Sequence, residues 1–307
     1  GGGEVAPSLG LGLEGVDESS AEGAEAAYPA TLPPFSTHDV AERLRKLADD
    51  DDIRALEEPE EGGELAGMVR IVEAAWQDLS QKARGAGARS AAQAEVERAV
   101  GSQRPATYGE LRLATAAGML RLAGAEPGQV FYDLGSGTGK VVALAWLFGL
   151  RATGVELVSA RWGVACEALG RLRRDGAASP RPGEQGSERA SPALRYVRAS
   201  FLDVDFADAD IVFMDNVMFT EEMMQGLARA ARRLRPGALV ISAHRPALPG
   251  PGFRLRERFF GPTTWSNKSV WAVHVVDRQS DAEAAAAPPP RPAATAKHDI
   301  CEIGSPA

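Results

Sequence analysis

The ten residues 131–140, FYDLGSGTGK, constrain the fold of this 307-residue chain more than any other stretch. A short apolar run ends in the acidic residue Asp133, and Gly135, Gly137 and Gly139 follow at alternate positions. Glycine tolerates positive φ and has no Cβ, so a ligand can approach such a turn closely. In an open α/β sheet, the turn after the first strand lies at the edge where ligands bind. The stretch therefore predicts a ligand-binding turn between a buried strand and a helix.

After residue 104 the sequence alternates short apolar runs with amphipathic stretches. The apolar runs are typical of strands, and the last two read as an antiparallel pair; they cover 129–135, 151–157, 193–203, 209–219, 238–244, 253–261 and 269–277. The intervening stretches have the period and the capping residues of helices. This alternation predicts an α/β fold with a doubly wound, mostly parallel seven-stranded sheet.

Composition divides the chain into four parts. Residues 1–36 are rich in Gly, Ala, Glu and Pro, which predicts a disordered N-terminal segment. Residues 37–103 have a helical pattern, residues 104–278 form the predicted sheet domain, and residues 279–307 are low in complexity and are expected to be disordered. No apolar run approaches the roughly 18 residues of a membrane-spanning helix, so we expect no membrane association.

Charge and cysteine content limit the kind of partner and compartment. The net charge of −8 argues against a protein that coats nucleic acid. A local cluster is still present, which is either a solvated face or a binding patch: Arg161, Arg171, Arg173, Arg174, Arg181, Arg189, Arg195 and Arg198. The two cysteines, Cys166 and Cys301, lie far apart and outside any metal-ligand spacing, which favours a reducing compartment. The four histidines are scattered, so no metal site is predicted.

The spacing of the glycines decides between cofactors. A dinucleotide fingerprint would need glycine at position 140, which is Lys140, and a phosphate-binding P-loop would need glycine at Leu134. An acidic residue before the turn would also repel phosphate. S-adenosylmethionine has a sulfonium and an ammonium group and no phosphate, so it suits Asp133. Glu156 stands about 20 residues on, where a carboxylate would bind ribose hydroxyls.

Four segments together resemble the disruptor-of-telomeric-silencing family, histone methyltransferases that act on a lysine in the globular core of histone H3. They are Tyr108-Gly109-Glu110, FYDLGSGTGKVV, TGVEL, and IVFMDNVMF followed by RPGALVIS. A weaker likeness extends to TTWSNKSVWAVHVV. The resemblance covers about residues 104–277 and implies a class I S-adenosylmethionine-dependent methyltransferase fold.

The resemblance also implies a role for each matching residue. Asn216, Tyr108 and Trp265 would be catalytic, with Phe219 and Trp271 as further walls of a lysine channel. The cofactor would be bound by Tyr108, Glu110, Asp133, Gly135, Ser136, Gly137, Gly139, Glu156, Phe201 and Asn216. Among these, Glu156 would hold the ribose and Phe201 would stack on the adenine, although Phe201 and Trp265 could equally be packing residues. The chain departs from the family pattern at Ser200, Asp215 and Ala272.

The implied partner is histone H3 in nucleosomes, with a nucleosomal DNA contact through the arginine cluster, and the implied location is the nucleus. Two alternatives stay open. One is a methyltransferase of the same fold that acts on another protein, a small molecule or RNA. The other is a cofactor-binding scaffold with weak or no catalysis.

Overall fold

The computed structural model describes residues 53–56, 60–174, 193–244, 248, 250–267, 269–277 and 298–303. The predicted disorder of residues 1–36, the helix expected after Thr37, and Arg181 and Arg189 lie outside these ranges.

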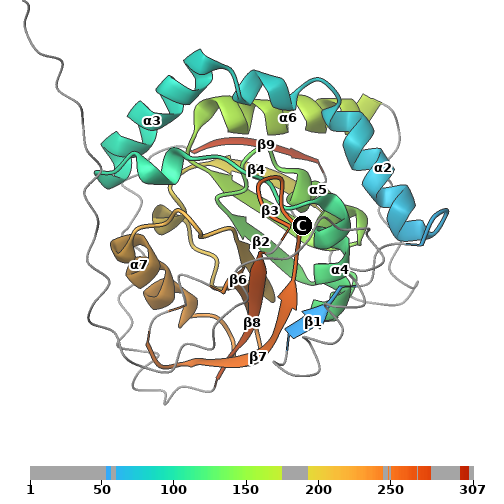
Figure 1. The fold of residues 1–307 in the computed structure, drawn as a ribbon, viewed down its shortest axis with the longest axis vertical. Coiled ribbons are helices and arrows are strands. Elements are labelled where there is room, and N and C mark those ends of the chain that lie inside the picture. Colours follow the sequence, from blue (N-terminus) through green and yellow to red (C-terminus); the bar gives the residue numbers. More distant parts are fainter. Residues whose placement is uncertain are drawn as a thin grey trace, which may run out of the picture.

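The described residues build one nine-stranded sheet with the order β1-β7-β8-β6-β5-β2-β3-β4-β9 (Figure 1). The strands are β1 Ile53–Ala55, β2 Val130–Leu134, β3 Arg151–Glu156, β4 Leu194–Arg198, β5 Ile211–Met214, β6 Leu239–Ala243, β7 Phe253–Phe260, β8 Val270–Val276 and β9 Asp299–Ile303. The central strands β6, β5, β2, β3 and β4 are parallel, and β8 runs antiparallel to both β6 and β7. The predicted doubly wound sheet and its antiparallel pair are confirmed.

Helices cover both faces of this sheet. They are α2 Glu64–Trp76, α3 Ala86–Val100, α4 Leu113–Ala123, α5 Lys140–Leu147, α6 Ser159–Arg174 and α7 Glu221–Ala231, with single 3₁₀ turns at η1 Ser80–Ala83, η2 Arg104–Ala106 and η3 Phe201–Asp203. On β5, Ile211 and Phe213 belong to the core cluster with α4, α5 and α6, and Val212 and Met214 belong to the cluster with α7. All four residues are buried, as expected for a parallel strand covered on both faces.

Two edge strands correct the sequence-based expectations. The sheet has nine strands rather than seven, since β1 lies in the region expected to be helical and β9 in the tail expected to be disordered. Strand β1 has three residues and pairs in parallel with β7, and such a short strand leaves almost no periodic signal. Strand β9 follows a low-complexity stretch and gains its structure from antiparallel pairing with β4.

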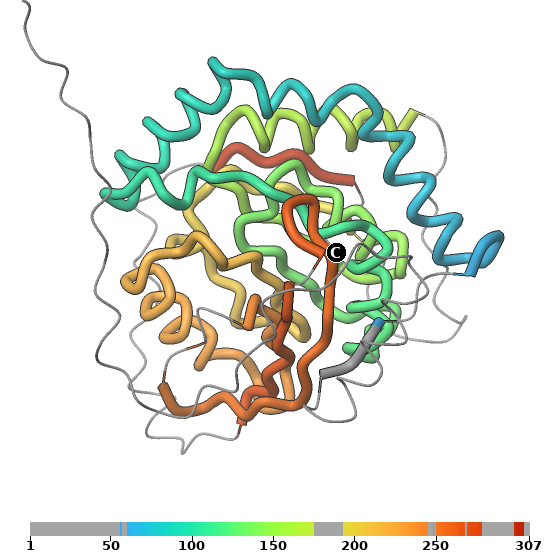
Figure 2. The backbone as a smooth tube through the Cα atoms, viewed as in Figure 1, coloured from blue at the N-terminus to red at the C-terminus, as the bar shows by residue number. Residues whose placement is uncertain are grey.

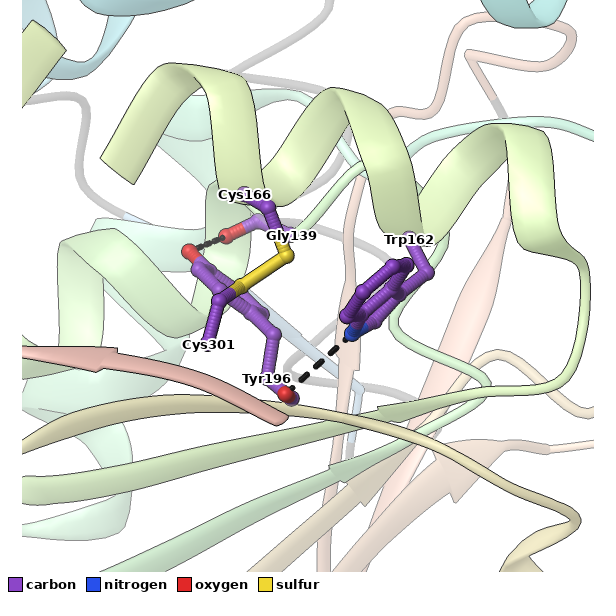
Figure 3. Close-up of a disulfide and its surroundings, with 5 residues drawn as sticks. All are labelled: Gly139, Trp162, Cys166, Tyr196 and Cys301. Atoms are coloured by element: carbon purple, nitrogen blue, oxygen red, sulfur yellow. Dashed lines mark hydrogen bonds between the residues drawn. A yellow bond between two sulfur atoms is a disulfide. The ribbon is translucent and has the colours of Figure 1, made fainter. Parts of the chain in front are cut away.

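The two cysteines also correct an expectation, because Cys166 of α6 and Cys301 of β9 form a disulfide (Figure 3). The register of β9 on β4 places Cys301 opposite Tyr196, beneath α6. The two cysteines are 135 residues apart in sequence, but their Cα atoms are 5.8 Å apart. Figure 2 shows β9 running alongside β4 under α6. The inference of a reducing compartment rested on unpaired cysteines and therefore loses its basis.

Across the described ranges, no helix is both long enough and apolar enough to cross a bilayer.

Candidate active site

A cavity of about 420 Å³ lies at the carboxyl ends of β2, β3 and β5. Its walls come from the glycine turn after β2, from Glu156 to Val158 after β3, and from the segment after β5 that includes Asp215 and Phe219. Two loops from outside these strands complete it, one at Tyr108 to Leu111 and one at Trp265. The cavity thus lies where ligands bind in open α/β sheets.

The glycine turn leaves room on its cavity side. Gly135 and Gly137 have φ of +90° and +57°, which favours glycine. A Cβ on Gly137 would lie 2.6 Å from Cε2 of Tyr108, so a side chain there would displace the Tyr108 ring. Gly139 is different, because it does not line the cavity and a Cβ on it would lie 2.4 Å from Tyr196. Its carbonyl accepts a hydrogen bond from the Tyr196 hydroxyl at 2.8 Å (Figure 3), so the structure places Gly139 in the packing of α5.

Glu110 is the centre of a hydrogen-bonded group at the rim of the cavity. Its Oε1 accepts from the hydroxyls of Tyr108 and Thr138, and its Oε2 accepts from Lys140 Nζ and Arg84 Nη2, each at 2.9 Å. Burial alone would raise the pKa of Glu110, but Lys140 and the two hydroxyls lower it below its usual value. The carboxylate therefore stays ionised. Sequence reasoning found Tyr108 and Glu110 but missed Thr138, Lys140 and Arg84.

Tyr108 lies between this group and a buried arginine. The guanidinium of Arg161 is 4.6 Å from the centroid of the Tyr108 ring, a cation–π distance. Burial and the charge of Glu110 raise the pKa of Tyr108 well above its usual value, so the phenol stays neutral. Arg161 is itself buried, and its Nη2 donates to the carbonyl of Ala106. One arginine of the sequence cluster is thus part of the cavity wall.

Glu156 is fixed at the end of β3. Its Oε1 accepts from the backbone N–H of Val158 and its Oε2 from that of Gly137, both at 2.8 Å. Arg161 Nη1 lies 4.0 Å from Oε1. Burial nevertheless raises the pKa of Glu156, with Arg161 and the backbone donors opposing the shift. Each carboxylate oxygen can accept a second hydrogen bond, so Glu156 can still bind hydroxyl groups.

Asp133 and Asp215 are two carboxylates that have no cation beside them. Neither makes an ion pair with any residue in the described part of the chain. Burial raises the pKa of Asp133 well above its usual value, and the charges of Glu156 and Asp215 raise it further. Burial also raises the pKa of Asp215 to about 6, although a hydrogen bond from the backbone N–H of Val217 lowers it in part. Such groups favour a positively charged ligand.

The two loops that close the cavity are joined to each other. Leu111 forms a bridge with Thr263, Glu110 N donates to Thr264 Oγ1 at 3.1 Å, and Thr264 N donates to the Glu110 carbonyl at 2.9 Å. Trp265 is packed directly against Gly109, where a Cβ would lie 2.0 Å from Cε3 of the indole. The Tyr-Gly-Glu segment and the tryptophan loop, about 150 residues apart, therefore form one wall.

An aromatic pair forms another part of the wall. The rings of Phe201 and Phe219 are stacked with centroids 4.9 Å apart. Phe219 also lies above the glycine turn, because a Cβ on Gly135 would be 3.5 Å from its Cζ. The predicted adenine contact of Phe201 stays a prediction, and Phe219 is its present stacking partner.

Three residues that the resemblance linked to the channel do not line the cavity. Asn216 is fully buried, and its Oδ1 accepts from the backbone N–H of Ala243 at 2.8 Å. Trp271 lies in the core of β8, where its Nε1 donates to the Gly261 carbonyl at 2.9 Å. Ala272 is also buried in β8. The expectation that Trp271 forms a channel wall is therefore wrong, and the Ala272 departure lies away from the cavity.

Replacing Gly109 with alanine is expected to push the Trp265 indole off the cavity wall, since the new Cβ and the ring cannot both fit. Trp265 is 47% exposed, so we expect a loss in the free energy of unfolding of less than about 1 kcal/mol. Acrylamide quenching of tryptophan fluorescence should increase. Gly87→Ala is the matched control, because a Cβ there meets nothing within 4 Å. The same comparison is then made in a Trp265→Phe background. If Gly109→Ala no longer changes the quenching there, the change is due to Trp265, and a remaining difference would contradict this assignment.

The sequence pattern of the family described as "Histone methylation protein DOT1" matches residues 91–251, which is more than half of the chain. The chain belongs to the DOT1 family. This agrees with the resemblance of the Tyr-Gly-Glu segment, the glycine turn and the block after β5. The DOT1-family sheet domain has the class I S-adenosylmethionine-dependent methyltransferase fold, as the resemblance implied.

Curated relatives are found in two strains of Cryptococcus neoformans var. neoformans serotype D, JEC21 and B-3501A. Both relatives are called "Histone-lysine N-methyltransferase, H3 lysine-79 specific" and are 30% identical over 164 residues. The match covers 53% of this chain and 25% of each relative, so the chain spans about a quarter of their length.

Solved structures with some likeness are also methyltransferases. TrmN from Thermus thermophilus has a TM-score of 0.44 and 23% identity, and covers 57% of this chain and 52% of its own. An RNA methyltransferase from Salinibacter ruber in complex with S-adenosyl-L-homocysteine has a TM-score of 0.38 and 19% identity, with 54% and 92% covered. Likenesses this low add nothing to the family assignment.

The cavity residues fit S-adenosylmethionine, the cofactor of this fold. Asp133 is a buried carboxylate that makes no ion pair with the described residues, which suits a ligand that carries positive charge. Glu156 has hydrogen-bonding capacity left for hydroxyl groups. The bare turn at Gly135 and Gly137 gives the ligand access to the backbone, and Phe201 provides an aromatic surface.

Proposed function

We propose that this protein is an S-adenosylmethionine-dependent protein-lysine N-methyltransferase that acts on a core lysine of histone H3 in nucleosomes. The observation that carries the proposal is the acidic cavity itself. It joins the glycine turn after β2 to a wall made of the Tyr-Gly-Glu segment and Trp265. By the name of its curated relatives, the target would be lysine 79 of histone H3.

When bound, S-adenosylmethionine would supply an electrophilic methyl group for transfer to an amine nitrogen. Asp133 would balance the positive charge of the cofactor, and Glu156 would hold its ribose. Tyr108 and Glu110 would cover the methionine end, because their hydrogen bonds to Thr138 hold this segment against the glycine turn. The protein thus binds and orients, and alignment supplies much of the rate.

The substrate amine must be neutral to attack, and its ordinary pKa of about 10.4 keeps it protonated at pH 7. A channel lined by Phe219 and Trp265 would lower that pKa, since apolar surroundings disfavour the charged form. Asn216 would act as a positioning residue, because its bond to Ala243 N joins the ends of β5 and β6 below the segment that carries Phe219.

The proposed nucleosome contact uses fewer arginines than the sequence suggested. Arg161 is buried, and Arg195 and Arg198 form ion pairs with Glu302 and Asp299 of β9 at 2.9 and 3.2 Å. Arg173 and Arg174 are exposed at the end of α6 and are the better candidates for nucleosomal DNA. A nuclear location follows from this proposed substrate.

We expect the full chain to transfer tritiated methyl groups to nucleosomes faster than to free histone H3, and not to RNA. The modified residue is then identified by mass spectrometry. Asp133→Asn should reduce the transfer at least about a hundredfold, because it removes the charge that faces the cofactor. Transfer to RNA alone would support the alternative RNA methyltransferase, and cofactor binding without any transfer would support the scaffold.

A further inference from the structure

The charges on the cavity wall do not balance. Among the described residues, four carboxylates line the cavity, Glu110, Asp133, Glu156 and Asp215, but only two basic side chains do, Lys140 and Arg161. Lys140 is bound to Glu110 at 2.9 Å, as is Arg84 from outside the cavity wall, and Arg161 lies 4.0 Å from Glu156. Asp133 and Asp215 are left, since neither makes an ion pair within the described residues.

One cofactor cannot neutralise both remaining carboxylates. S-adenosylmethionine has a sulfonium, an ammonium and a carboxylate, so it brings a single net positive charge. Asp133 borders the glycine turn and would face that charge. Asp215 follows β5, which pairs directly with β2, and its charge acts on Asp133 across the two strand ends. Asp215 can therefore accept a second cation, one that the cofactor does not supply.

We propose that Asp215 determines substrate specificity, pairing with the ammonium of the incoming amine substrate and accepting the proton that its nitrogen must lose. This rests on the methyltransferase activity proposed above. The carboxylate is a departure from the family pattern, which has asparagine at this position. A neutral amide can neither form an ion pair with an ammonium nor accept its proton. The proton would pass from nitrogen to a carboxylate oxygen of Asp215 and on to solvent.

The local electrostatics support this role. Asp215 is followed by Val217 and Phe219, which line the cavity, so an amine that enters beside Phe219 meets the carboxylate in largely apolar surroundings. Charges attract more strongly there than in water. The facing charged groups are Asp133 from β2 and Glu156 from β3, with Glu110, Lys140 and Arg161 on the other walls. Of these, only Asp133 lacks a partner of its own, and the cofactor would supply it.

The expected pH dependence follows from the pKa of Asp215, which burial raises to about 6. Below that pH the carboxyl group is protonated and neither attracts a cation nor accepts a proton. Above it the group is ionised, so affinity for an ammonium and the rate of transfer both rise through about pH 6. In Asp215→Asn this rise through about pH 6 disappears, and the rate then follows the loss of the proton of the amine itself.

The binding test uses n-butylammonium as a mimic of a lysine side chain and n-butanol as its neutral counterpart. Each is titrated by NMR into the full chain saturated with sinefungin, an unreactive analogue that has an ammonium group in place of the sulfonium and so keeps the positive charge that faces Asp133. We expect wild type to bind n-butylammonium at least about tenfold more tightly than Asp215→Asn, with equal affinity for n-butanol. Glu73→Gln, which removes one exposed charge from α2, is the matched control and should behave as wild type. Unchanged S-adenosylhomocysteine affinity shows that Asp215→Asn is folded. Equal affinity of wild type and Asp215→Asn for n-butylammonium overturns the proposal.

The second test separates this inference from the proposed function. If wild type methylates nucleosomes and Asp215→Asn keeps the same rate and pH profile, the role of Asp215 is refuted while the function stands. If nucleosomes are not methylated but n-butylammonium still distinguishes wild type from Asp215→Asn, Asp215 is an ammonium-binding residue and the histone substrate is refuted.

Discussion

Gly137→Arg is expected to weaken binding of S-adenosylhomocysteine at least about a hundredfold, about 2.7 kcal/mol in binding free energy. At this position φ is +57°, and even a Cβ would lie 2.6 Å from Cε2 of Tyr108. An arginine would therefore displace Tyr108 and fill the space over the turn. Its guanidinium would also lie in the part of the cavity that Asp133 and Glu156 line. Isothermal calorimetry gives the affinity directly.

The chain offers a matched control for the backbone strain. Gly124 has φ of +69° at the end of α4, but a side chain there would meet nothing within 4 Å. Gly124→Arg carries the same strain and the same added charge away from the cavity. We expect both variants to lose about 1 kcal/mol of folding stability from the strain, and Gly137→Arg to lose more because it displaces Tyr108. Only Gly137→Arg should lose affinity. Equal affinity in the two variants would show that the ligand does not lie over this turn.

The sequence predicted the central sheet well because each buried strand and its helix leave a strong periodic signal. It also identified Asp133 and Glu156, since both follow directly from their places at strand ends. The partners of Glu110 were harder to predict. Arg84 and Lys140 reach it from the loop before α3 and from the first turn of α5, and only the folded chain brings them together.

Burial explains why Trp271, expected in the channel wall, lies in the core instead. Alternate side chains of a strand face opposite sides of the sheet, but consecutive residues at the start of β8 are all buried, so this part of the strand is covered on both faces. Trp271 and Ala272 are therefore both core residues, and neither reaches the cavity. Trp265, in the loop just before β8, remains as the aromatic residue of this segment on the cavity wall.

The disulfide is expected to have the largest effect on folding stability. Cys166 and Cys301 are 135 residues apart, and the chain-entropy estimate for a loop of that length is about 5 kcal/mol. Measured losses are more often about 2–4 kcal/mol, which we expect for Cys301→Ser in chemical denaturation. Without the bond, β9 would be held by its pairing with β4 and by two exposed ion pairs, each contributing at most about 1 kcal/mol.

Because the disulfide joins β9 to α6, we expect its loss to loosen the strands beside it as well as to lower the free energy of unfolding. Tyr196 of β4 connects α6 with the glycine turn. Its carbonyl accepts a hydrogen bond from Trp162 Nε1 of α6 at 3.2 Å, and its hydroxyl donates to the carbonyl of Gly139 (Figure 3). We therefore expect hydrogen exchange to rise first in β9 and β4 of Cys301→Ser, before the turn is affected. Adding a reductant should destabilise wild type to the level of Cys301→Ser and leave that variant unchanged. Two reactive thiols in unreduced, denatured wild type would show instead that the cysteines are not bonded, and β9 would then depend on its pairing with β4 and on the two ion pairs.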